Sequence, residues 1–396
     1  DNAPLTGSAS AATTATRNLA TGSRRVTLDA AGNVTGTWLK SVVFYDSYDR
    51  PIQTLSNNHL YTTMADKSTV IYDFAGRTVK TKTTHTSSTS FNVALTDRPE
   101  YDHAGRVLKL YRKINSDAEQ LLCEYVYNAL GQVIDKKLHN TSGSNYLQSV
   151  DYRYNIRGWL KSINNSQLTN DGTLNDDDGD FFGMELAYNT DAGMGSNSYY
   201  NGNIGAIKWK NFVTAGAADQ RSYKYTYDKS DRLTTAAFNA NTGSAWTKES
   251  GTLDETMTYD ANGNISTLLR KRDSRGLSST TVTSTPETID NLTYTYASYS
   301  PNRHIKIEDS GNSAGFNNGI TANVEYKYDT IGNVTADKNK GIDSVHYNFL
   351  GKVRRIKFSD GKVITYTYDA GGSKLKMSVT ASGSTTTTDY AGSFVY

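Results

Sequence analysis

The sequence predicts an all-β chain built from antiparallel hairpins, and three observations support this prediction. A short turn motif recurs along the chain, the segments before it alternate in the way of strands, and the composition favours strands. The 396 residues include 28 Tyr and 11 Phe but only 5 Pro. Aromatic and β-branched residues fit a pleated, half-buried surface, and a scarcity of proline leaves strands uninterrupted.

The turn motif is Tyr-Asp/Asn-x-x-Gly, and it occurs eight times, against fewer than about one match expected by chance from average composition. The matches begin at Tyr72, Tyr101, Tyr127, Tyr154, Tyr259, Tyr328, Tyr347 and Tyr368. Two further units, at Tyr45 and Tyr227, carry Asp49 and Asp231 at the glycine position. Repetition of this kind indicates one architecture that grows by adding units.

Each residue type in the motif has a physical role. The Tyr ends a strand and presents a large ring with a polar tip. The Asp or Asn side chain accepts hydrogen bonds from amides of the turn. The Gly supplies a positive φ, as in a short hairpin loop with a bulge, and Asp visits these angles more readily than most residues. We therefore expect hairpin turns at Gly76, Gly105, Gly131, Gly158, Gly263, Gly332, Gly351 and Gly372.

The motif residues that we single out as turn-forming are Tyr72, Asp73, Gly76, Tyr101, Asp102, Gly105, Tyr259, Asp260, Gly263, Tyr328, Asp329, Gly332, Tyr368, Asp369 and Gly372. The strand before a turn often repeats tyrosine with a period of two, as at Tyr223, Tyr225 and Tyr227. This period places the rings on one face of a sheet, where stacked hairpins would align them. We interpret these rings as sheet packing rather than as a ligand platform.

Several segments resemble the YD repeats of RHS proteins: YDFAGRTVKT, YDHAGRVLKL, YDANGNISTL and YDTIGNVTAD. The stretches VDYRYNIRGWLKSIN, FFGMELAYN, YNGNIGAIKWKN and TTDYAGSFVY resemble the Bacteroidota branch of that family. The resemblance runs from about Leu39 to Tyr396. It implies a curved, spiralling sheet that is part of a hollow β-shell, which in the family often encloses a C-terminal toxin. The family's core signature and its autoproteolytic aspartates have no counterpart here, so no catalytic residue is carried over.

We divide the chain into four parts. Residues 1–37 form a polar N-terminal extended segment, 38–165 and 223–396 are YD repeats, and 166–222 is an irregular insertion with an acidic loop. A hairpin cannot bury its tyrosine face alone, so neighbouring hairpins must cover it. We also expect open sheet edges near Trp38 and Tyr396, where a longer parent chain would continue.

The acidic loop is the candidate for metal chemistry. Asp176, Asp178, Asp180 and Glu185 offer oxygen ligands of the kind that calcium prefers, although a helix-loop-helix count would place Leu174 at the first ligand position. The alternative is a solvated acidic loop, since charged residues usually lie at the surface. We expect no other cofactor. No zinc-type histidine spacing, GxSxG motif or phosphate-binding glycine loop occurs, so we expect no enzymatic activity.

The chain has 42 basic and 40 acidic residues, and this balance does not indicate nucleic-acid binding. No apolar stretch approaches the roughly 18 residues that a membrane span needs. The expected function is a structural shell or scaffold segment of a large secreted RHS-repeat protein that encloses and delivers a C-terminal effector, a polymorphic toxin. The alternative is a cell-surface adhesin that binds glycans or other cells. The expected partners are the remainder of a longer chain and the effector, with secretion machinery or surface glycans beside them. The Bacteroidota-like segments suggest a secreted or cell-surface location reached by type IX export.

Overall fold

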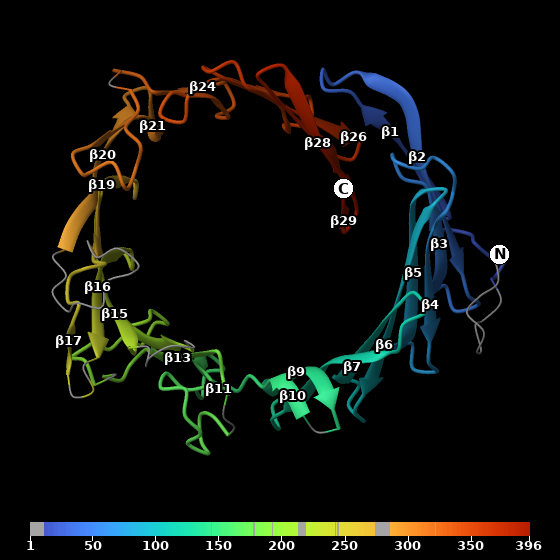
Figure 1. Ribbon diagram of the computed structural model, residues 1–396, viewed down its shortest axis with the longest axis horizontal. Coiled ribbons are helices and arrows are strands. Elements are labelled where there is room, and N and C mark those ends of the chain that lie inside the picture. The colour runs from blue at the N-terminus through green and yellow to red at the C-terminus, as the bar shows by residue number, and fades with distance from the viewer. Residues whose placement is uncertain are drawn as a thin grey trace. The chain divides into compact units, whose positions relative to one another are not determined.

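The computed structural model describes residues 12–143, 145–176, 179–191, 193–212, 219–241, 243, 245–273, 286–320 and 322–396. Every regular element in these ranges is a β-strand, and the strands pair in antiparallel hairpins (Figure 1). The predicted all-β hairpin fold is therefore confirmed. No helix long and apolar enough to cross a membrane is found in this described part of the chain.

The chain forms two compact units. The first comprises Asp1–Tyr125, His139–Asn145 and Gly341–Tyr396, and the second comprises Val126–Leu138 and Tyr146–Lys340. Three strands have residues in both units: β8 (Gln120–Tyr127), β9 (Val133–Ser142) and β10 (Asn145–Gln148).

The first unit contains the strands from both ends of the chain. These are β1 (Gly22–Leu28), β2 (Val34–Tyr45), β3 (Pro51–Ser56), β4 (Asp66–Tyr72), β5 (Thr78–Ser88), β6 (Phe91–Tyr101), β7 (Val107–Ile114), β24 (Ile342–Tyr347), β25 (Val353–Phe358), β26 (Val363–Asp369), β27 (Lys374–Ala381), β28 (Ser384–Ala391) and β29 (Phe394–Val395).

The second unit contains the central strands. These are β11 (Tyr152–Tyr154), β12 (Leu160–Ile163), β13 (Phe182–Ala187), β14 (Ala206–Asn211), β15 (Arg221–Tyr227), β16 (Leu233–Asn241), β17 (Trp246–Lys248), β18 (Glu255–Tyr259), β19 (Ile265–Asp273), β20 (Pro286–Ala297), β21 (Ser300–Asp309), β22 (Tyr326–Tyr328) and β23 (Val334–Asp337).

In the first unit, strands β2 to β7 pair with their chain neighbours, as do β24 to β28. Strand β1 joins the two series, because Val26 pairs with Trp38 of β2 and Leu28 pairs with Tyr368 of β26. In Figure 1 the blue β1 accordingly lies beside the red β26. The expectation of an open sheet edge near Trp38 is wrong, since β1 occupies that edge.

The polar segment 1–37 contains β1 and the start of β2. In the second unit, β11 to β16 and then β18 to β21 pair in chain order, and β17 pairs with β16. The segment 166–222, which the sequence suggested to be irregular, contributes β13 and β14 to this series, paired from Phe182↔Asn211 to Ala187↔Ala206. The segments 1–37 and 166–222, which lack the turn motif, therefore both add strands to the sheets.

Buried side chains are polar more often than apolar among the described residues, and most strand side chains are half-buried. Leu292, Ile307 and Tyr326 form a small apolar cluster of buried residues in the second unit. A buried polar group is costly unless it is hydrogen-bonded. These sheets therefore depend on hydrogen bonds to a greater degree than a globular core does.

The motif turns carry the predicted bulge. The register between paired strands shifts at Tyr72, at Tyr101 and at Tyr259, in each case at the last strand residue before the turn. The extra residue that a bulge adds turns the local side chain away from the regular ladder. This frees the motif tyrosine to contact a neighbouring repeat.

We predict that Gly263→Val destabilises the protein by roughly 1–3 kcal/mol, because a β-branched residue resists a positive φ. The φ of Gly263 is +87°, and an added Cβ would meet only Arg232 Nη1, at an ordinary 3.7 Å. The cost would therefore come from the backbone and not from a clash. Urea unfolding of both proteins measures it.

The matched control is Asp49→Gly, because Asp49 already adopts φ +60° at the same motif position. We expect this variant to be neutral or slightly more stable, since glycine accepts the angle without strain. A Gly263→Val protein that unfolds at the wild-type urea concentration would contradict the assigned role of the positive φ.

Candidate functional site

The turn of each repeat is held by its Asp or Asn side chain, as the turn from Tyr259 to Asn264 illustrates. The Asp260 amide donates to the Asn264 carbonyl at 2.9 Å, and the Gly263 amide donates to the Asp260 carbonyl at 3.1 Å. Asp260 Oδ1 accepts from the amides of Asn262 and Asn264, both at 2.9 Å. One carboxylate oxygen thus ties two amides that the hairpin leaves unpaired.

All eight predicted turn glycines have a positive φ, at Gly76, Gly105, Gly131, Gly158, Gly263, Gly332, Gly351 and Gly372. Asp49 and Asp231 both adopt φ +60°. Asn replaces Asp without changing the contacts: Asn155 Oδ1 accepts from the amides of Arg157 and Trp159. The motif therefore encodes one backbone geometry with two interchangeable side chains.

These hydrogen bonds favour the ionised turn aspartates. The pKa values of Asp73, Asp102 and Asp228 are lowered, chiefly by the amide of the arginine four residues on, which donates to the carboxylate. The pKa of Asp260 is lowered chiefly by the Asn264 side chain. Donors aimed at a carboxylate stabilise its charged form.

The motif tyrosine links its repeat to the preceding one. Tyr259 Oη donates to the Leu233 carbonyl at 2.7 Å, and Leu233 is the second residue after the glycine position of the preceding turn. The same relation recurs at Tyr72 with Pro51, Tyr101 with Thr78, Tyr154 with Val133 and Tyr368 with Val353. Partial burial raises the pKa of Tyr72, Tyr101 and Tyr368, which keeps each hydroxyl a donor.

The tyrosine contact also reveals repeats that the sequence motif missed. Tyr188 Oη donates to the Leu160 carbonyl at 3.0 Å, and Tyr296 Oη donates to the Ile265 carbonyl at 2.8 Å. Neither Tyr188 nor Tyr296 begins a Tyr-Asp/Asn-x-x-Gly match. A search for strand-ending tyrosines without the glycine would have found them.

The arginine that follows many turn glycines makes a second link, in the same chain direction. Arg232 Nε donates to Asp228 Oδ2 at 2.7 Å within its own turn. Its guanidinium carbon lies 4.6 Å from the ring centroid of Tyr259, in the next repeat, and Nη1 donates to the Asp260 carbonyl at 3.2 Å. A planar guanidinium can pair with a carboxylate and stack on a ring at once, which a lysine does less well.

The same set of contacts occurs at other turns. Arg50 lies 4.9 Å from the Tyr72 ring centroid and donates to the Asp73 carbonyl at 3.2 Å. Arg77 lies 5.2 Å from the Tyr101 ring centroid. In the sequence, Arg50 directly follows Asp49 and Arg77 directly follows Gly76, but the sequence does not show that either arginine contacts the next tyrosine.

The residues of the calcium hypothesis have other partners. Asp180 is buried and accepts from Asn175 Nδ2 at 2.6 Å, and Glu185 is paired with Lys208 at 3.0 Å. The backbone of Asp176 is held by Asp151 Oδ2. Asp178 lies outside the described residues. No group of three or more His, Cys, Asp or Glu is arranged for a metal ion in the part of the chain that is described, and calcium binding stays an untested prediction.

No protein-family model and no curated protein matches the chain. Solved structures do match it. The chain is similar to TcdB2-TccC3-TEV at 12% identity and TM-score 0.48, over 94% of this chain and 20% of that one. It is similar to TcdB2-TccC3 without its hypervariable C-terminal region at 14% identity and TM-score 0.47, over 93% and 20%. A third match is the Photorhabdus luminescens Tc holotoxin pore, at 15% identity and TM-score 0.36, over 88% and 16%.

The chain thus spans about a fifth of the length of the first two structures that it matches. Alignments with TM-scores below 0.5 do not establish that two chains share a function. The contacts within the chain itself have to support any functional proposal.

We predict that Tyr259→Phe lowers the free energy of unfolding by about 0.5–1.5 kcal/mol, because the Leu233 carbonyl loses its hydroxyl donor while the ring stays in place. Tyr299→Phe is the matched control, since Tyr299 is 82% exposed, and it should leave stability unchanged. Equal effects of the two substitutions in urea unfolding would show that the hydroxyl contact contributes nothing.

We also predict an acid limit to stability set by the turn aspartates. Their folded-state pKa is lowered, so their contribution is fully present above the unfolded-state pKa of about 3.9 and is lost as the pH falls through the folded-state value. The urea midpoint should therefore hold from pH 7 to about pH 5 and fall below about pH 4.

Asp228→Asn should flatten this acid decline, because Asn keeps the acceptor oxygen and cannot be protonated there. The chain already uses Asn in this way at Asn155 and Asn348. If the urea midpoint of the variant falls as steeply with pH as that of the wild type, protonation of Asp228 does not cause the acid decline.

Proposed function

We propose that this chain is a wall segment of a large RHS-type protein, and that the complete protein encloses and delivers a C-terminal effector. The observation that carries the proposal is the hydrogen bond from a motif tyrosine hydroxyl to a carbonyl of the preceding repeat, which recurs at Tyr72, Tyr101, Tyr154, Tyr259 and Tyr368. With the arginine contacts to the following repeat, it makes every repeat depend on both neighbours. Such units extend a sheet by stacking, which suits a wall.

The wall function needs no catalytic group, and we propose none for this chain. A continuous sheet separates two spaces by steric exclusion, and pairing of its edges limits aggregation. The proposed partners are the remainder of a longer chain and the effector. The Bacteroidota-like segments are the ground for proposing a secreted or cell-surface location and type IX export.

A second candidate function is cell-surface adhesion, and one observation favours it. Large apolar side chains at the turn tips are fully or largely exposed, among them Tyr48, Phe74 and Ile156. Exposed apolar side chains of this kind are accessible to a partner surface. Binding of the purified chain to whole cells, lost on Phe74→Ser, would support adhesion over enclosure.

The enclosure proposal is tested on the full-length product of the gene, isolated from its native host and treated with a non-specific protease. We expect a segment outside residues 1–396 to resist digestion until the sheets unfold. The double variant Arg232→Ala, Tyr259→Phe should lose this protection at a lower temperature, because it removes both links between two repeats.

Tyr299→Phe serves as the control and should protect the segment as the wild type does. Digestion of that segment at the same rate inside and outside the intact protein would count against enclosure. A full-length gene product that has no segment outside residues 1–396 would also count against enclosure.

A further inference from the structure

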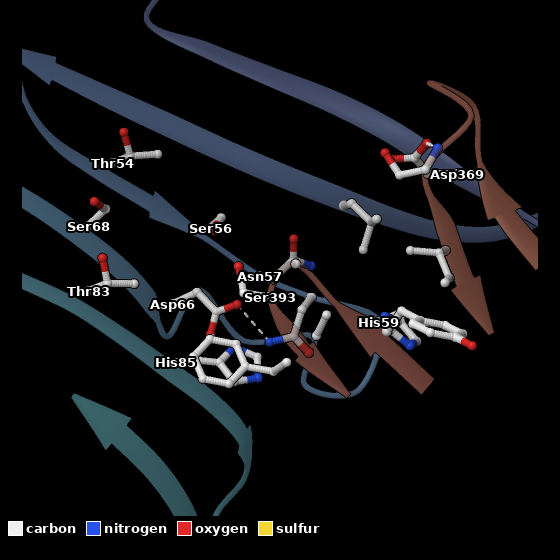
Figure 2. Close-up of a pocket in the computed structure, with 18 of the residues that line it drawn as sticks. Thr54, Ser56, Asn57, His59, Asp66, Ser68, Thr83, His85, Asp369 and Ser393 are labelled. Carbon is white, nitrogen blue, oxygen red and sulfur yellow. Dashed lines mark hydrogen bonds and ion pairs between the residues drawn. The ribbon is translucent and has the colours of Figure 1, made fainter. Parts of the chain in front are cut away.

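A pocket of about 440 Å³ lies within the first unit, and the proposed wall function does not use it. Its floor is one face of β3, β4 and β5, and its opposite side comes from the C-terminal strands and from the link between β28 and β29 (Figure 2). Pockets that hold small molecules have roughly this volume, within about 300–1,000 Å³.

The floor presents a row of hydroxyl groups. Thr54 of β3 is paired with Ser68 of β4, and Ser68 is paired with Thr83 of β5. Ser56, two residues from Thr54, lies on the same face, and Figure 2 shows the four side chains on neighbouring strands. In the described part of the chain none of these hydroxyls has a hydrogen bond to another protein group. Each can both donate and accept.

The loop beside the floor is rigid, because its polar groups are used within the protein. Asn57 Nδ2 donates to the carbonyls of Trp38 and Thr62, at 2.9 and 3.1 Å. Asn58 Oδ1 accepts from the Leu60 amide at 2.9 Å, and Asn58 Nδ2 donates to Asp66 Oδ2 at 2.8 Å. The pocket is therefore formed before any ligand arrives, which lowers the cost of binding.

His85 belongs to the pocket lining, and its ring is held by Asp66. Its Nδ1 lies 3.0 Å from Asp66 Oδ1, and that carboxylate also accepts from the Thr86 amide at 2.9 Å. When Nδ1–H donates to Asp66, Nε2 carries the lone pair of the neutral ring. Nε2 is buried and has no hydrogen-bond partner. Phe394 stacks on the ring, with centroids 4.2 Å apart and planes 10° apart.

Two classes of ligand fit this lining poorly. A peptide strand needs an open backbone edge, but β3, β4 and β5 are each paired on both sides. An ion needs an unpaired opposite charge. Asp369 accepts from the amides of Gly371 and Ser373, and Lys374 Nζ lies 3.9 Å from the Tyr390 ring centroid. Lys67, also in the lining, interacts within the chain too.

We propose that this pocket binds an uncharged, polyhydroxylated ligand, with a sugar ring as its chemical class. The floor hydroxyls exchange hydrogen bonds with the ligand's hydroxyls, and the stacked rings of His85 and Phe394 form part of the lining beside them. The proposal does not rest on the wall function, because a wall segment can carry a binding pocket on one face.

The test titrates the purified 396-residue chain with glucose, galactose, mannose, N-acetylglucosamine, maltose and lactose, followed by calorimetry and by the His85 imidazole nitrogen resonances. We expect at least one neutral sugar to bind and to shift the resonances of the His85 ring, which belongs to the pocket lining. The double variant Ser68→Val, Thr83→Val should weaken this binding about tenfold or more, since it removes two hydroxyls and keeps residues that favour strands.

Thr81→Val is the matched control. Thr81 lies on the same face of β5, two residues from Thr83, but outside the lining, and its loss should change affinity less than about twofold. The single variant Thr83→Val, which is nearly isosteric, repeats the test if the double variant melts early. No binding by any of the six sugars would overturn the proposal. Equal affinity in the hydroxyl-deleted variants, or tighter binding of glucuronate or inorganic phosphate, would overturn it as well.

Discussion

The hydrogen bond from a motif tyrosine to the preceding repeat is the contact on which the rest of the structure depends. At the motif turns this bond goes with a bulge at the tyrosine, because the register shifts at that residue in hairpin after hairpin. The bulge at a motif turn is accompanied by the positive φ of the turn and by the amide hydrogen bonds to its Asp or Asn. The hydrogen bonds of the turn and the tyrosine bond between repeats are therefore coupled. A substitution that disturbs one of them should also disturb the other.

This constraint explains why polar groups fill so much of the buried space. A sheet that grows by stacking hairpins offers each side chain one face and two neighbours, and it gathers only a small apolar cluster around Leu292 and Ile307. Directional bonds fix register where apolar packing alone would allow a slip. The arginine between Asp228 and Tyr259 does the same for neighbouring turns. Networks of this kind couple their members more strongly than isolated pairs.

Features that depend on local backbone sterics could be predicted from the sequence. Contacts between residues far apart in the chain could not. The turn glycines were predictable because few other residues accept a positive φ, and Asp49 and Asp231 followed from the same rule. The pairing of β1 with β26 was not, because its partners are more than 300 residues apart and nothing in either segment marks the other. Tyr188 was missed because its link to Leu160 needs only a strand-ending tyrosine and not the full motif.

The hydroxyl-lined pocket could not be predicted for the same reason, because strands that are distant in the sequence form its two sides. The turns fix the strands from their ends, so the side chains on the faces between the turns are free to vary without loss of register. Thr54, Ser68 and Thr83 are ordinary strand residues by pattern, and only the C-terminal strands make their face one side of a pocket. His59 and Asp389, 330 residues apart, meet at 3.1 Å beside it. The residues that recur in each repeat lie at the turns, so the side chains on the strand faces can differ from repeat to repeat, and the sequence motif does not indicate a pocket there.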